Sequence, residues 1–568
     1  MSQTRKRPRA GTLGLLAAAA AVALLLSSCS GDALGGLVRE HGASADGSSA
    51  GGEGPHSTKS DVTDEGTPIS SLRPAASPAL TAFDRQVVHW TPCHHVFKCG
   101  TVRVPIDWQH IGTASIKIAL IMHPATGSLL GDLVVNPGGP GGSGVEFVEE
   151  GVDGVVDGSV AQHYNVIGFD PRGVGASAPV TCYDDAGTDK YFYDIDPGAV
   201  GSKTWIAAEE KKSRDLAAAC ARNTGPVLAH IDSISVAQDL DVIRAAVRQP
   251  KLNYLGYSYG TYLGTLYAGL FPNRVGRTVL DGADDPWGSD YQISDPSGGS
   301  GSFGVGPNVD GTVGQTIGFE SSLVDYLRGC LSNTSTTVGR FRCPFTSTLA
   351  RAKVRVEQEF ARVNAHPLVT KDGRKLGGAT LATAIDDALY DSSDWPALTR
   401  MFVQLEDGNP AQAFEFADEY NDRNPDGTYS DNDDFAHLAI GCIEDGNDVD
   451  LSFDRREAAE LRKVAPMLGI YSAYGDLICS GWRYSSSPFP NPIHARGTGP
   501  ILVLGNTGDP ATPYSDAVDL ARQLDNGHLV TLHGEGHTSY DLGNGCIDRT
   551  VDDYLLSGAV PDRDPDCH

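Results

Sequence analysis

Short apolar runs that end in glycine, proline or aspartate alternate with helix-like segments along much of the chain. Residues 101–108 (TVRVPIDW) and 115–125 (SIKIALIMHPA) alternate apolar and polar side chains, which predicts paired strands. Shorter and more continuously apolar runs follow: DLVVNPGG (132–139), YNVIGFDPRG (164–173), LNYLGYS (252–258) and RTVLDGAD (277–284). Residues 233–249 have helical spacing between two of these runs. Strands that alternate with helices predict a mostly parallel, doubly wound sheet.

The pattern changes after Asp285 and returns near residue 496. Residues 286 to about 310 are rich in Gly, Ser and Asp, and segments with helical spacing follow at 319–330, 349–363, 379–390, 395–407, 411–420 and 455–468. Strand-like runs resume in GPILVLGNTGDPATP (499–513) and GHLVTLHGEGHTSY (527–540). The sequence therefore predicts a core formed by residues 81–285 and 496–568, with a mainly helical cap inserted over residues 286–495.

The first 80 residues differ from the rest of the chain. Four basic residues precede the uncharged run AGTLGLLAAAAAVALLLSSC, an order typical of an export signal. The run ends in LSSC, which resembles the lipobox of bacterial lipoproteins, where the cysteine, here Cys29, is acylated. We expect a signal peptide at 1–28, a lipid anchor at Cys29 on the outer face of the cell membrane, and a flexible tether at 29–80. An ordinary cleavage site with release from the cell is the alternative.

Charge and cysteine content narrow the classes of partner. The formal net charge is −28 and no basic run occurs outside the signal, so we expect no nucleic acid partner. Setting Cys29 aside, ten cysteines remain, and none forms a C-x-x-C pair. An even number in an exported chain predicts disulfides rather than a metal cluster. The simplest pairing is five disulfides, each between two cysteines that follow one another along the chain. We expect neither a metal nor a cofactor.

Ser258 lies in the motif Gly256-Tyr257-Ser258-Tyr259-Gly260, between an apolar run and the helix-like segment TYLGTLYAGLF. A G-x-S-x-G motif in the context strand, turn, helix is typical of a nucleophile elbow, in which the serine has a strained backbone conformation. The glycines on both sides leave room for the chain to pass close to itself. The sequence thus predicts a nucleophilic serine at the edge of the sheet.

Two later loops supply partners for this serine. Asp509 in GNTGDPATP follows an apolar run, and His537 in HGEGHTSY follows the next one. The order Ser258, Asp509, His537 is that of α/β-hydrolases. We therefore expect His537 to take the proton from Ser258 and to return it to the leaving group, while Asp509 orients the imidazole and stabilises its positive charge.

The glycine-rich segment LVVNPGGPGGSG (133–144) follows a predicted strand upstream of the serine. An α/β-hydrolase places its oxyanion loop at this point of the chain. The backbone N–H groups of Tyr259 and Gly139 are the predicted donors to the oxyanion.

Other residues compete for these roles. Asp281 also ends a predicted strand and is the alternative acid for His537. His533 lies four residues before His537, but the two are separated by a glycine turn rather than sharing a helix face, and no third metal ligand is evident. We therefore expect His533 to cap its strand.

The same glycine-rich segment also fits a different class of protein. Gly139-x-Gly141-x-x-Gly144 follows a strand and Asp170 ends the next one, which is the dinucleotide-binding pattern of an oxidoreductase. Pro137 and Pro140 count against it because proline lacks the N–H that a pyrophosphate would need. Export of the chain also counts against this pattern, because free dinucleotides are scarce outside cells.

Taken together, the motifs NPGGPGGSG, FDPRGVGAS, GYSYGTYLG, VLDGADDP, AIGCIEDG, GDPATP and GEGH resemble those of the secreted tripeptidyl aminopeptidases of actinobacteria and their cell-envelope relatives. This family is related to the prolyl aminopeptidases within the α/β-hydrolases, and the resemblance covers residues 85 to 568. It implies an α/β-hydrolase fold with a helical cap, and release of tripeptides from free N-termini through a serine acyl-enzyme.

The resemblance also implies carboxylates that bind the substrate's α-ammonium group. In related aminopeptidases acidic residues from the cap do this, so Glu444 is the first candidate and Asp445 the second. A solvated acidic turn is the alternative. Cys442, in the same motif, is expected to pair with Cys479.

One further motif has calcium-loop spacing. Residues 422–433 (DRNPDGTYSDND) place Asp422, Asn424, Asp426, Gly427, Ser430 and Asp433 in that order. Pro425 and an Asp at the last position weaken the match, and a surface turn between cap helices explains the same residues.

Three functions remain open from the sequence. The first is a lipid-anchored serine aminopeptidase that acts on peptide substrates with a free N-terminus. The second is an extracytoplasmic carboxylesterase of the same fold, and the third is a non-enzymatic peptide-binding lipoprotein. A binding protein would have no need for a strained serine together with an acid and a histidine, which disfavours the third.

Overall fold

The computed structural model describes residues 69–112, 114–285, 307–332, 342–444, 446, 449–486 and 492–568. The predicted signal peptide, Cys29 and Asp445 lie outside these residues, as does most of the predicted tether. Within the described part, none of the helices combines the length and the hydrophobicity that a membrane span requires.

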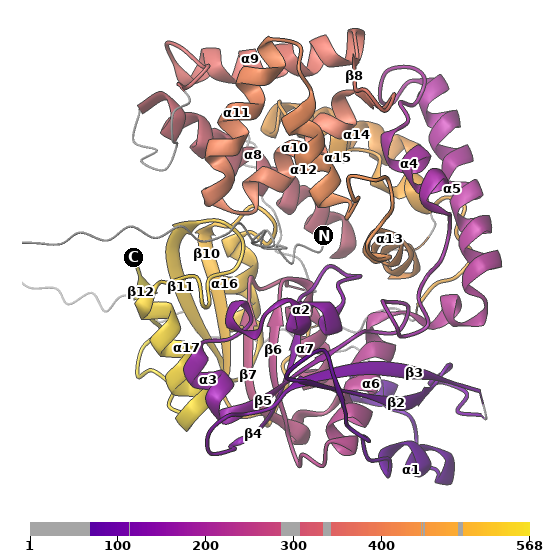
Figure 1. Cartoon of the computed structure of the whole chain (residues 1–568), viewed down its shortest axis with the longest axis vertical. Coiled ribbons are helices and arrows are strands. Elements are labelled where there is room, and N and C mark those ends of the chain that lie inside the picture. The colour runs from indigo at the N-terminus through magenta and orange to yellow at the C-terminus, as the bar shows by residue number, and fades with distance from the viewer. Residues whose placement is uncertain are drawn as a thin grey trace, which may run out of the picture. The chain divides into compact units, whose positions relative to one another are not determined.

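The core is built on a sheet of ten strands in the order β1-β2-β3-β5-β4-β6-β7-β10-β11-β12 (Figure 1). β1 to β3 and the pairing of β3 with β5 are antiparallel, and the pairs from β5 to β12 are parallel. The strands are β1 (Thr91–Cys93), β2 (Phe97–Pro105), β3 (Ser115–His123), β4 (Gly131–Asn136), β5 (Tyr164–Phe169), β6 (Leu252–Tyr257), β7 (Val275–Asp281), β10 (Ile501–Gly508), β11 (Gly527–Glu535) and β12 (Asp566–Cys567). The predicted α/β-hydrolase sheet is confirmed.

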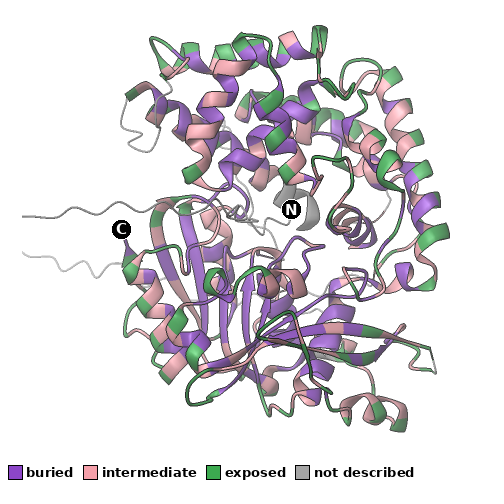
Figure 2. Ribbon diagram, viewed as in Figure 1, coloured by how far each residue is buried: buried purple, intermediate pink, exposed green. Residues whose placement is uncertain are grey.

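Helices cover both faces of this sheet. One cluster of buried side chains joins the strands to α1 (Pro78–Asp84), α6 (Ser233–Ala246), α7 (Tyr259–Leu270) and α16 (Tyr514–Gln523). The other cluster joins them to α2 (Gly144–Glu150), α3 (Gly158–His163) and α17 (Gly545–Ser557). In β4, Val134 packs in the first cluster and Leu133 and Val135 in the second. Burial on both faces explains why these strands are continuous apolar runs (Figure 2).

The helical insertion lies between β7 and β10 and forms a separate core. It contains α8 (Pro307–Ser332), α9 (Leu349–Ala365), α10 (Gly378–Leu389), α11 (Trp395–Glu406), α12 (Ala411–Tyr420), α13 (Asp433–Glu444), α14 (Leu451–Val464) and α15 (Gly469–Ser472), with the short pair β8 (Leu368–Val369) and β9 (Lys375–Leu376). A third cluster of buried side chains joins most of these helices and includes Ala511, from the loop after β10. The cap thus rests on the carboxyl end of the sheet (Figure 1).

Part of the segment assigned to the core packs with the cap instead. α4 (Asp185–Tyr193) and α5 (Lys203–Thr224) lie beside the cap helices (Figure 1). Tyr193 belongs to the cap cluster, and Leu216 packs in a cluster with residues of α13. These two helices interrupt the strand pattern of residues 81–285, so the cap draws on two segments of the chain.

Ordered structure also begins before residue 81. The 3₁₀ turn Ile69–Leu72 and α1, which starts at Pro78, precede that boundary. Ile69, Leu72 and Leu80 pack against the core cluster, so these few apolar side chains are enough to order the end of the predicted tether.

The five bridges expected between sequence neighbours are present. They join Cys93 to Cys99, Cys182 to Cys220, Cys330 to Cys343, Cys442 to Cys479 and Cys546 to Cys567. Disulfides in this number are typical of proteins outside the cytoplasm. The Cys442–Cys479 bridge ties the last turn of α13 to the 3₁₀ turn Gly475–Cys479.

Candidate active site

Ser258 lies at the turn between β6 and α7 in a backbone conformation that L-residues rarely adopt. Its φ is 54° and its ψ is −131°. Its N–H donates to the Asp281 carbonyl at 2.9 Å, and its carbonyl accepts from the N–H and the hydroxyl of Thr261 at 2.7 and 2.6 Å. These bonds hold the strained turn at the carboxyl edge of the sheet, as expected for a nucleophile elbow.

The glycines around Ser258 are required by close approach of the backbone. A Cβ at Gly256 would lie 2.3 Å from the Gly260 carbonyl oxygen. A Cβ at Gly260 would lie 2.8 Å from both oxygens of Asn136, at the end of β4. Any side chain at either position would therefore push the helix away from the sheet.

His537 and Asp509 form a buried hydrogen-bonded pair. His537 Nδ1 lies 2.9 Å from each carboxylate oxygen of Asp509, and the two side chains are 8% and 0% exposed. Asp509 also accepts the N–H groups of Ala511 and Thr512, both at 2.9 Å. Because Nδ1 faces a carboxylate, it carries the ring proton and Nε2 keeps its lone pair.

The other ring nitrogen, His537 Nε2, is buried and has no hydrogen-bond partner in the described part of the chain. The ring lies beside the backbone that holds Ser258. A Cβ at Gly282 would be 2.9 Å from His537 Cε1, and Asp281, the preceding residue, accepts the Ser258 N–H. A basic nitrogen without a partner near a serine meets the requirement for a general base, whose hydrogen bond often tightens only when substrate binds.

The loop that carries His537 is fixed from both sides. Asn506, in β10, donates to the carbonyls of Gly536 and Thr538 at 2.8 and 2.6 Å. The His537 N–H donates to the Tyr390 carbonyl, just after α10, at 2.8 Å. The motif GNTGD contains Asn506, but only the fold shows that it reaches the histidine loop.

Asp281, the alternative acid, does not face the imidazole. Its fully buried carboxylate accepts from the Ser539 N–H at 3.1 and 3.0 Å, the Ser539 hydroxyl at 3.0 Å and the Tyr540 N–H at 2.8 Å. Burial raises its pKa. Asp281 therefore holds the segment that follows His537, and the carboxylate bonded to Nδ1 is that of Asp509.

His533 is a residue of β11 that faces the C-terminus of the chain. Its Nε2 lies 2.6 Å from Asp566 Oδ1, and its ring stacks on His568 with the centroids 4.5 Å apart. The expectation that His533 caps its strand is wrong, because β11 continues to Glu535, and the His533 side chain instead joins β11 to β12 and to His568.

The glycine-rich loop passes directly over the nucleophile. A Cβ at Gly138 would lie 2.9 Å from Ser258 Cβ and 3.1 Å from the Tyr259 nitrogen. The Gly138 N–H is used within the loop, where it donates to Asn136 Oδ1 at 3.1 Å. Tyr259 begins α7, so its N–H is one of the groups that a helix leaves unpaired in its first turn. Tyr259 and Gly139 remain the proposed oxyanion donors.

His437 of α13 braces this loop from the cap. Its Nδ1 lies 3.2 Å from the Pro140 carbonyl oxygen. Burial lowers the pKa of His437 to about 3, so the ring is neutral and donates to that carbonyl. The sequence offered no signal for this contact beyond the helical spacing of residues 435–444.

Glu444, the last residue of α13, is linked through Ser233 to the side chain of Tyr259, the residue that follows Ser258. Its Oε1 accepts the N–H of Ser233, the first residue of α6, at 2.5 Å. The Ser233 hydroxyl is hydrogen-bonded to the Tyr259 hydroxyl. Burial, and then the charge of Glu444, raise the pKa of Tyr259. Glu444 thus places a negative charge near the residue that follows Ser258.

Tyr390 of the cap packs against His537, and Asp386 and Tyr420 lie near Tyr390. Tyr390 is 4% exposed and packs edge-on against the His537 ring, with the centroids 5.5 Å apart. The hydroxyls of Tyr390 and Tyr420 and Oδ1 of Asp386 are buried and have no hydrogen-bond partner among the described residues. Burial raises the pKa of Asp386 to about 8. Buried polar groups without partners indicate a place where a ligand completes the hydrogen bonds.

The Asp386 carboxyl group predicts a pH-dependent cost to stability. Its pKa is about 8 in the folded protein against 3.8 in a free chain, so between those values the folded state holds a proton that the unfolded state releases. Stability therefore falls as pH rises through this window, by about 1.4 kcal/mol per pH unit. Asp386→Asn is expected to raise the midpoint of thermal unfolding at pH 8 and to leave it unchanged at pH 4. The exposed Asp407→Asn is the control, and an equal gain at both pH values would contradict the prediction.

Asp170, the acid of the dinucleotide alternative, is already used within the fold. Its Oδ1 accepts from the Ser143 hydroxyl at 2.6 Å and the Val145 N–H at 3.1 Å, and its Oδ2 accepts from the Ala176 N–H at 2.8 Å. The carboxylate ties the start of α2 to the loop after β5, and Asp170 as a whole residue is 2% exposed. It is not placed to bind a ribose, which disfavours the oxidoreductase alternative.

The doubly wound sheet, the strained serine after β6 and the buried acid and histidine after β10 and β11 define an α/β-hydrolase of the serine hydrolase class. Residues 133–298 match the model of the "alpha/beta hydrolase fold", and residues 465–567 match that of the "TAP-like protein" family.

Curated relatives extend over most of the chain. "Serine protease Hip1" of Mycobacterium tuberculosis is 34% identical over 504 residues, which cover 85% of this chain and 91% of that one. "Carboxylesterase B" of the same organism is 36% identical over 470 residues, or 82% and 85% of the two chains. "Tripeptidyl aminopeptidase" of Streptomyces lividans is 30% identical over 480 residues, or 83% of each chain. The chain belongs to the TAP-like family of α/β-hydrolases, and its fold and serine hydrolase class are those expected from the sequence.

Proposed function

We propose that the protein is a serine exopeptidase that releases tripeptides from the free N-termini of peptides or proteins. The observation that carries this proposal is the His537 imidazole near the strained Ser258: its Nδ1 is bound to Asp509, and its buried Nε2 has no hydrogen-bond partner among the residues that the structure describes. The relatives named as a serine protease and as a tripeptidyl aminopeptidase support the peptidase activity.

In the proposed reaction, Ser258 Oγ attacks the carbonyl carbon of the substrate's third residue, while His537 Nε2 takes the proton of the serine hydroxyl. The C–N bond then breaks, the leaving amine receives that proton, and the tripeptide stays on Ser258 as an ester. Water attacks this ester with His537 as base, and the proton returns to Ser258 as the tripeptide leaves. The N–H groups of Tyr259 and Gly139 stabilise the oxyanion in both steps.

Release of a fixed number of residues requires a group that binds the substrate's α-ammonium at a set distance from Ser258. Glu444 fulfils this role in the proposal, with Asp445 as the second candidate. The support is the position of Glu444 at the end of α13, close enough to the ring of Tyr259 to act on its pKa.

Digestion of a peptide library by the purified protein tests this function. The expected products are tripeptides from the N-terminus, identified by mass, and N-acetylated copies of the same peptides are expected to stay intact. Cleavage inside blocked peptides would overturn the exopeptidase assignment.

A carboxylesterase of the same fold is the second candidate, because one relative of 36% identity bears that name. Chromogenic substrates separate the two functions. An esterase hydrolyses short acyl esters faster than tripeptide anilides and is indifferent to a blocked N-terminus, whereas the proposed peptidase requires the free amine.

The proposal includes a lipid anchor at Cys29 that holds the enzyme on the outer face of the membrane. The support is the LSSC sequence after an uncharged run. Metabolic labelling with a fatty acid is expected to mark the protein, and Cys29→Ser is expected to remove the label and release the protein into the medium. A label that survives the substitution would exclude this site.

A further inference from the structure

The loop between α12 and α13 does not form the calcium loop that its spacing suggested. Asp426 accepts the N–H and the hydroxyl of Thr428 at 3.1 and 2.7 Å, and Asn424 donates to the same hydroxyl at 3.1 Å. These two expected ligands are therefore engaged in a local turn.

The same loop brings together a different set of carboxylates. One oxygen from each of Asp422, Asp431 and Asp433 lies within 4.8 Å of the others. Asp433 is 6% exposed, and its Oδ1 is buried with no hydrogen-bond partner in the described part of the chain. A buried carboxylate oxygen without a donor, on a side chain grouped with two more carboxylates, requires either a proton or a cation.

The surroundings of Asp433 favour a cation. Asp433 is buried, and Asp422 and Asp431 are partly buried. Three ionised carboxylates this close together repel one another, and water screens the repulsion least at the buried Asp433. A divalent cation would remove this repulsion and satisfy the unpartnered oxygen at the same time.

We propose that Asp422, Asp431 and Asp433 bind one calcium ion. Calcium takes oxygen ligands at 2.3–2.6 Å, so oxygens in one coordination shell can lie up to about 4.6–5.2 Å apart, and the 4.8 Å limit on the three carboxylate oxygens falls within this span. Magnesium loses its water reluctantly and is usually bound through one or two carboxylates, so a set of three favours calcium. Backbone carbonyls and water would complete the coordination.

The loop that carries the three carboxylates is held in shape by its own backbone. The Ser430 N–H donates to the Asp422 carbonyl at 3.0 Å, and Arg423 pairs with Tyr429 in an antiparallel bridge. The two ends of the loop are therefore close together before any ion binds, which lowers the entropic cost of binding.

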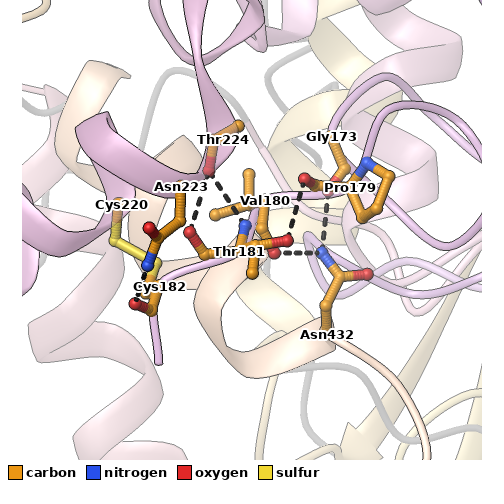
Figure 3. Close-up of a disulfide and its surroundings, with 9 residues drawn as sticks. All are labelled: Gly173, Pro179, Val180, Thr181, Cys182, Cys220, Asn223, Thr224 and Asn432. Atoms are coloured by element: carbon orange, nitrogen blue, oxygen red, sulfur yellow. Dashed lines mark hydrogen bonds between the residues drawn. A yellow bond between two sulfur atoms is a disulfide. The ribbon is translucent and has the colours of Figure 1, made fainter. Parts of the chain in front are cut away.

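Asn432, between two of the proposed ligands, anchors the loop to the core. Its amide donates to the carbonyls of Gly173 and Val180 at 2.9 and 3.0 Å, and its oxygen accepts the Gly175 N–H at 2.9 Å. Figure 3 shows this contact beside the Cys182–Cys220 bridge, where Asn223 donates to the Cys182 carbonyl and Thr181 pairs with Thr224. The proposed ion thus lies where the cap is fastened to the loop after β5.

The site also adjoins the oxyanion loop. A Cβ at Gly141 would lie 2.3 Å from the Asp433 carbonyl oxygen, so the first turn of α13 is packed directly on the glycine-rich loop. α13 continues to His437 and Glu444. Bound calcium would therefore fix the helix that braces the oxyanion loop and carries the proposed amine-binding carboxylate.

Thermal unfolding and calcium binding of the purified protein test the proposal. After treatment with EGTA, 5 mM CaCl₂ is expected to raise the unfolding midpoint by about 3 °C or more, and equilibrium dialysis with ⁴⁵Ca²⁺ is expected to give one site per chain. Asp431→Asn is the test variant, because an amide oxygen still accepts the Asp433 N–H that Asp431 now binds at 3.1 Å.

The proposal predicts that the order of stability of the parent and Asp431→Asn reverses when calcium is added. In EGTA, Asp431→Asn is expected to be at least as stable as the parent, because one repelling charge is gone. In calcium it is expected to be less stable and to bind no ⁴⁵Ca²⁺. Asp426→Asn, in the same loop but engaged in the local turn, is the matched control and keeps both calcium responses. Absence of binding by the parent, retained binding by Asp431→Asn, or an equal shift from magnesium would overturn the proposal.

Discussion

Asp509→Asn is expected to lower kcat about 10⁴-fold while the protein stays folded. Both oxygens of the Asp509 carboxylate lie 2.9 Å from His537 Nδ1, closer than the Thr512 hydroxyl at 3.3 Å, so Asp509 is the main acceptor of the Nδ1 proton. An amide can present its N–H₂ group to Nδ1, which would put the ring proton on Nε2 and remove the base that Ser258 needs. Steady-state kinetics on a free tripeptide anilide, together with the unfolding midpoint, measure the effect.

Two variants serve as controls for this prediction. Ser258→Ala is expected to lose activity to at least the same extent and to lose covalent labelling by a fluorophosphonate. Asp281→Asn is expected to lower the unfolding midpoint, because its carboxylate accepts bonds from Ser539 and Tyr540, and to lower kcat far less than Asp509→Asn. If Asp281→Asn proved the more damaging to kcat with an unchanged midpoint, the acid would have been assigned wrongly.

Glu444→Gln is expected to lower kcat/KM for tripeptides with a free N-terminus by about 10²-fold. A hydrogen bond to a charged group contributes about 1.5–3 kcal/mol, and each 1.4 kcal/mol corresponds to a factor of ten. Glutamine keeps an oxygen that accepts the Ser233 N–H, so the start of α6 stays capped and only the charge is lost. N-acetylated ester substrates isolate the effect: they have no ammonium to bind, and because an activated ester is far more reactive than a peptide bond, the enzyme is expected to hydrolyse them slowly but measurably although it leaves acetylated peptides intact.

The same substitution at an exposed glutamate of the cap is the control for Glu444→Gln. Glu415 is exposed on α12, and Glu415→Gln is expected to leave kcat/KM unchanged for both substrates. An equal loss on free and acetylated substrates with Glu444→Gln would show that Glu444 positions the site rather than binding the amine.

Much of the fold could be predicted from the sequence, because the patterns that indicate it lie among residues close together in the chain. Strands buried on both faces must be continuous apolar runs, and the elbow at Ser258 needs glycine at both flanking positions, since Cβ atoms there would collide with backbone. The disulfides were also predictable, because each pair is close in sequence.

The rest depended on contacts between distant segments. Asp281 and Asp509 both end strands and look alike in the sequence, yet one accepts from the backbone after His537 and the other from its ring. Tyr390 and His437 carry no local signal, because helical spacing predicts burial but not which buried side chain reaches the His537 ring or the glycine-rich loop. The packing of α4 and α5 with the cap was hidden for the same reason.

The sequence by itself determined the order of the elements, the strained serine, the two strand ends that carry an acid and a histidine, and the pairing of cysteines that are close in the chain. These features follow from backbone sterics and hydrophobic periodicity, which act over a few neighbouring residues. Only the tertiary structure decided which acid faces His537, how α13 meets the oxyanion loop, and which aspartates of residues 422–433 come together. Those outcomes depend on the folding of segments far apart in the chain, whose side chains meet at distances that no local pattern encodes.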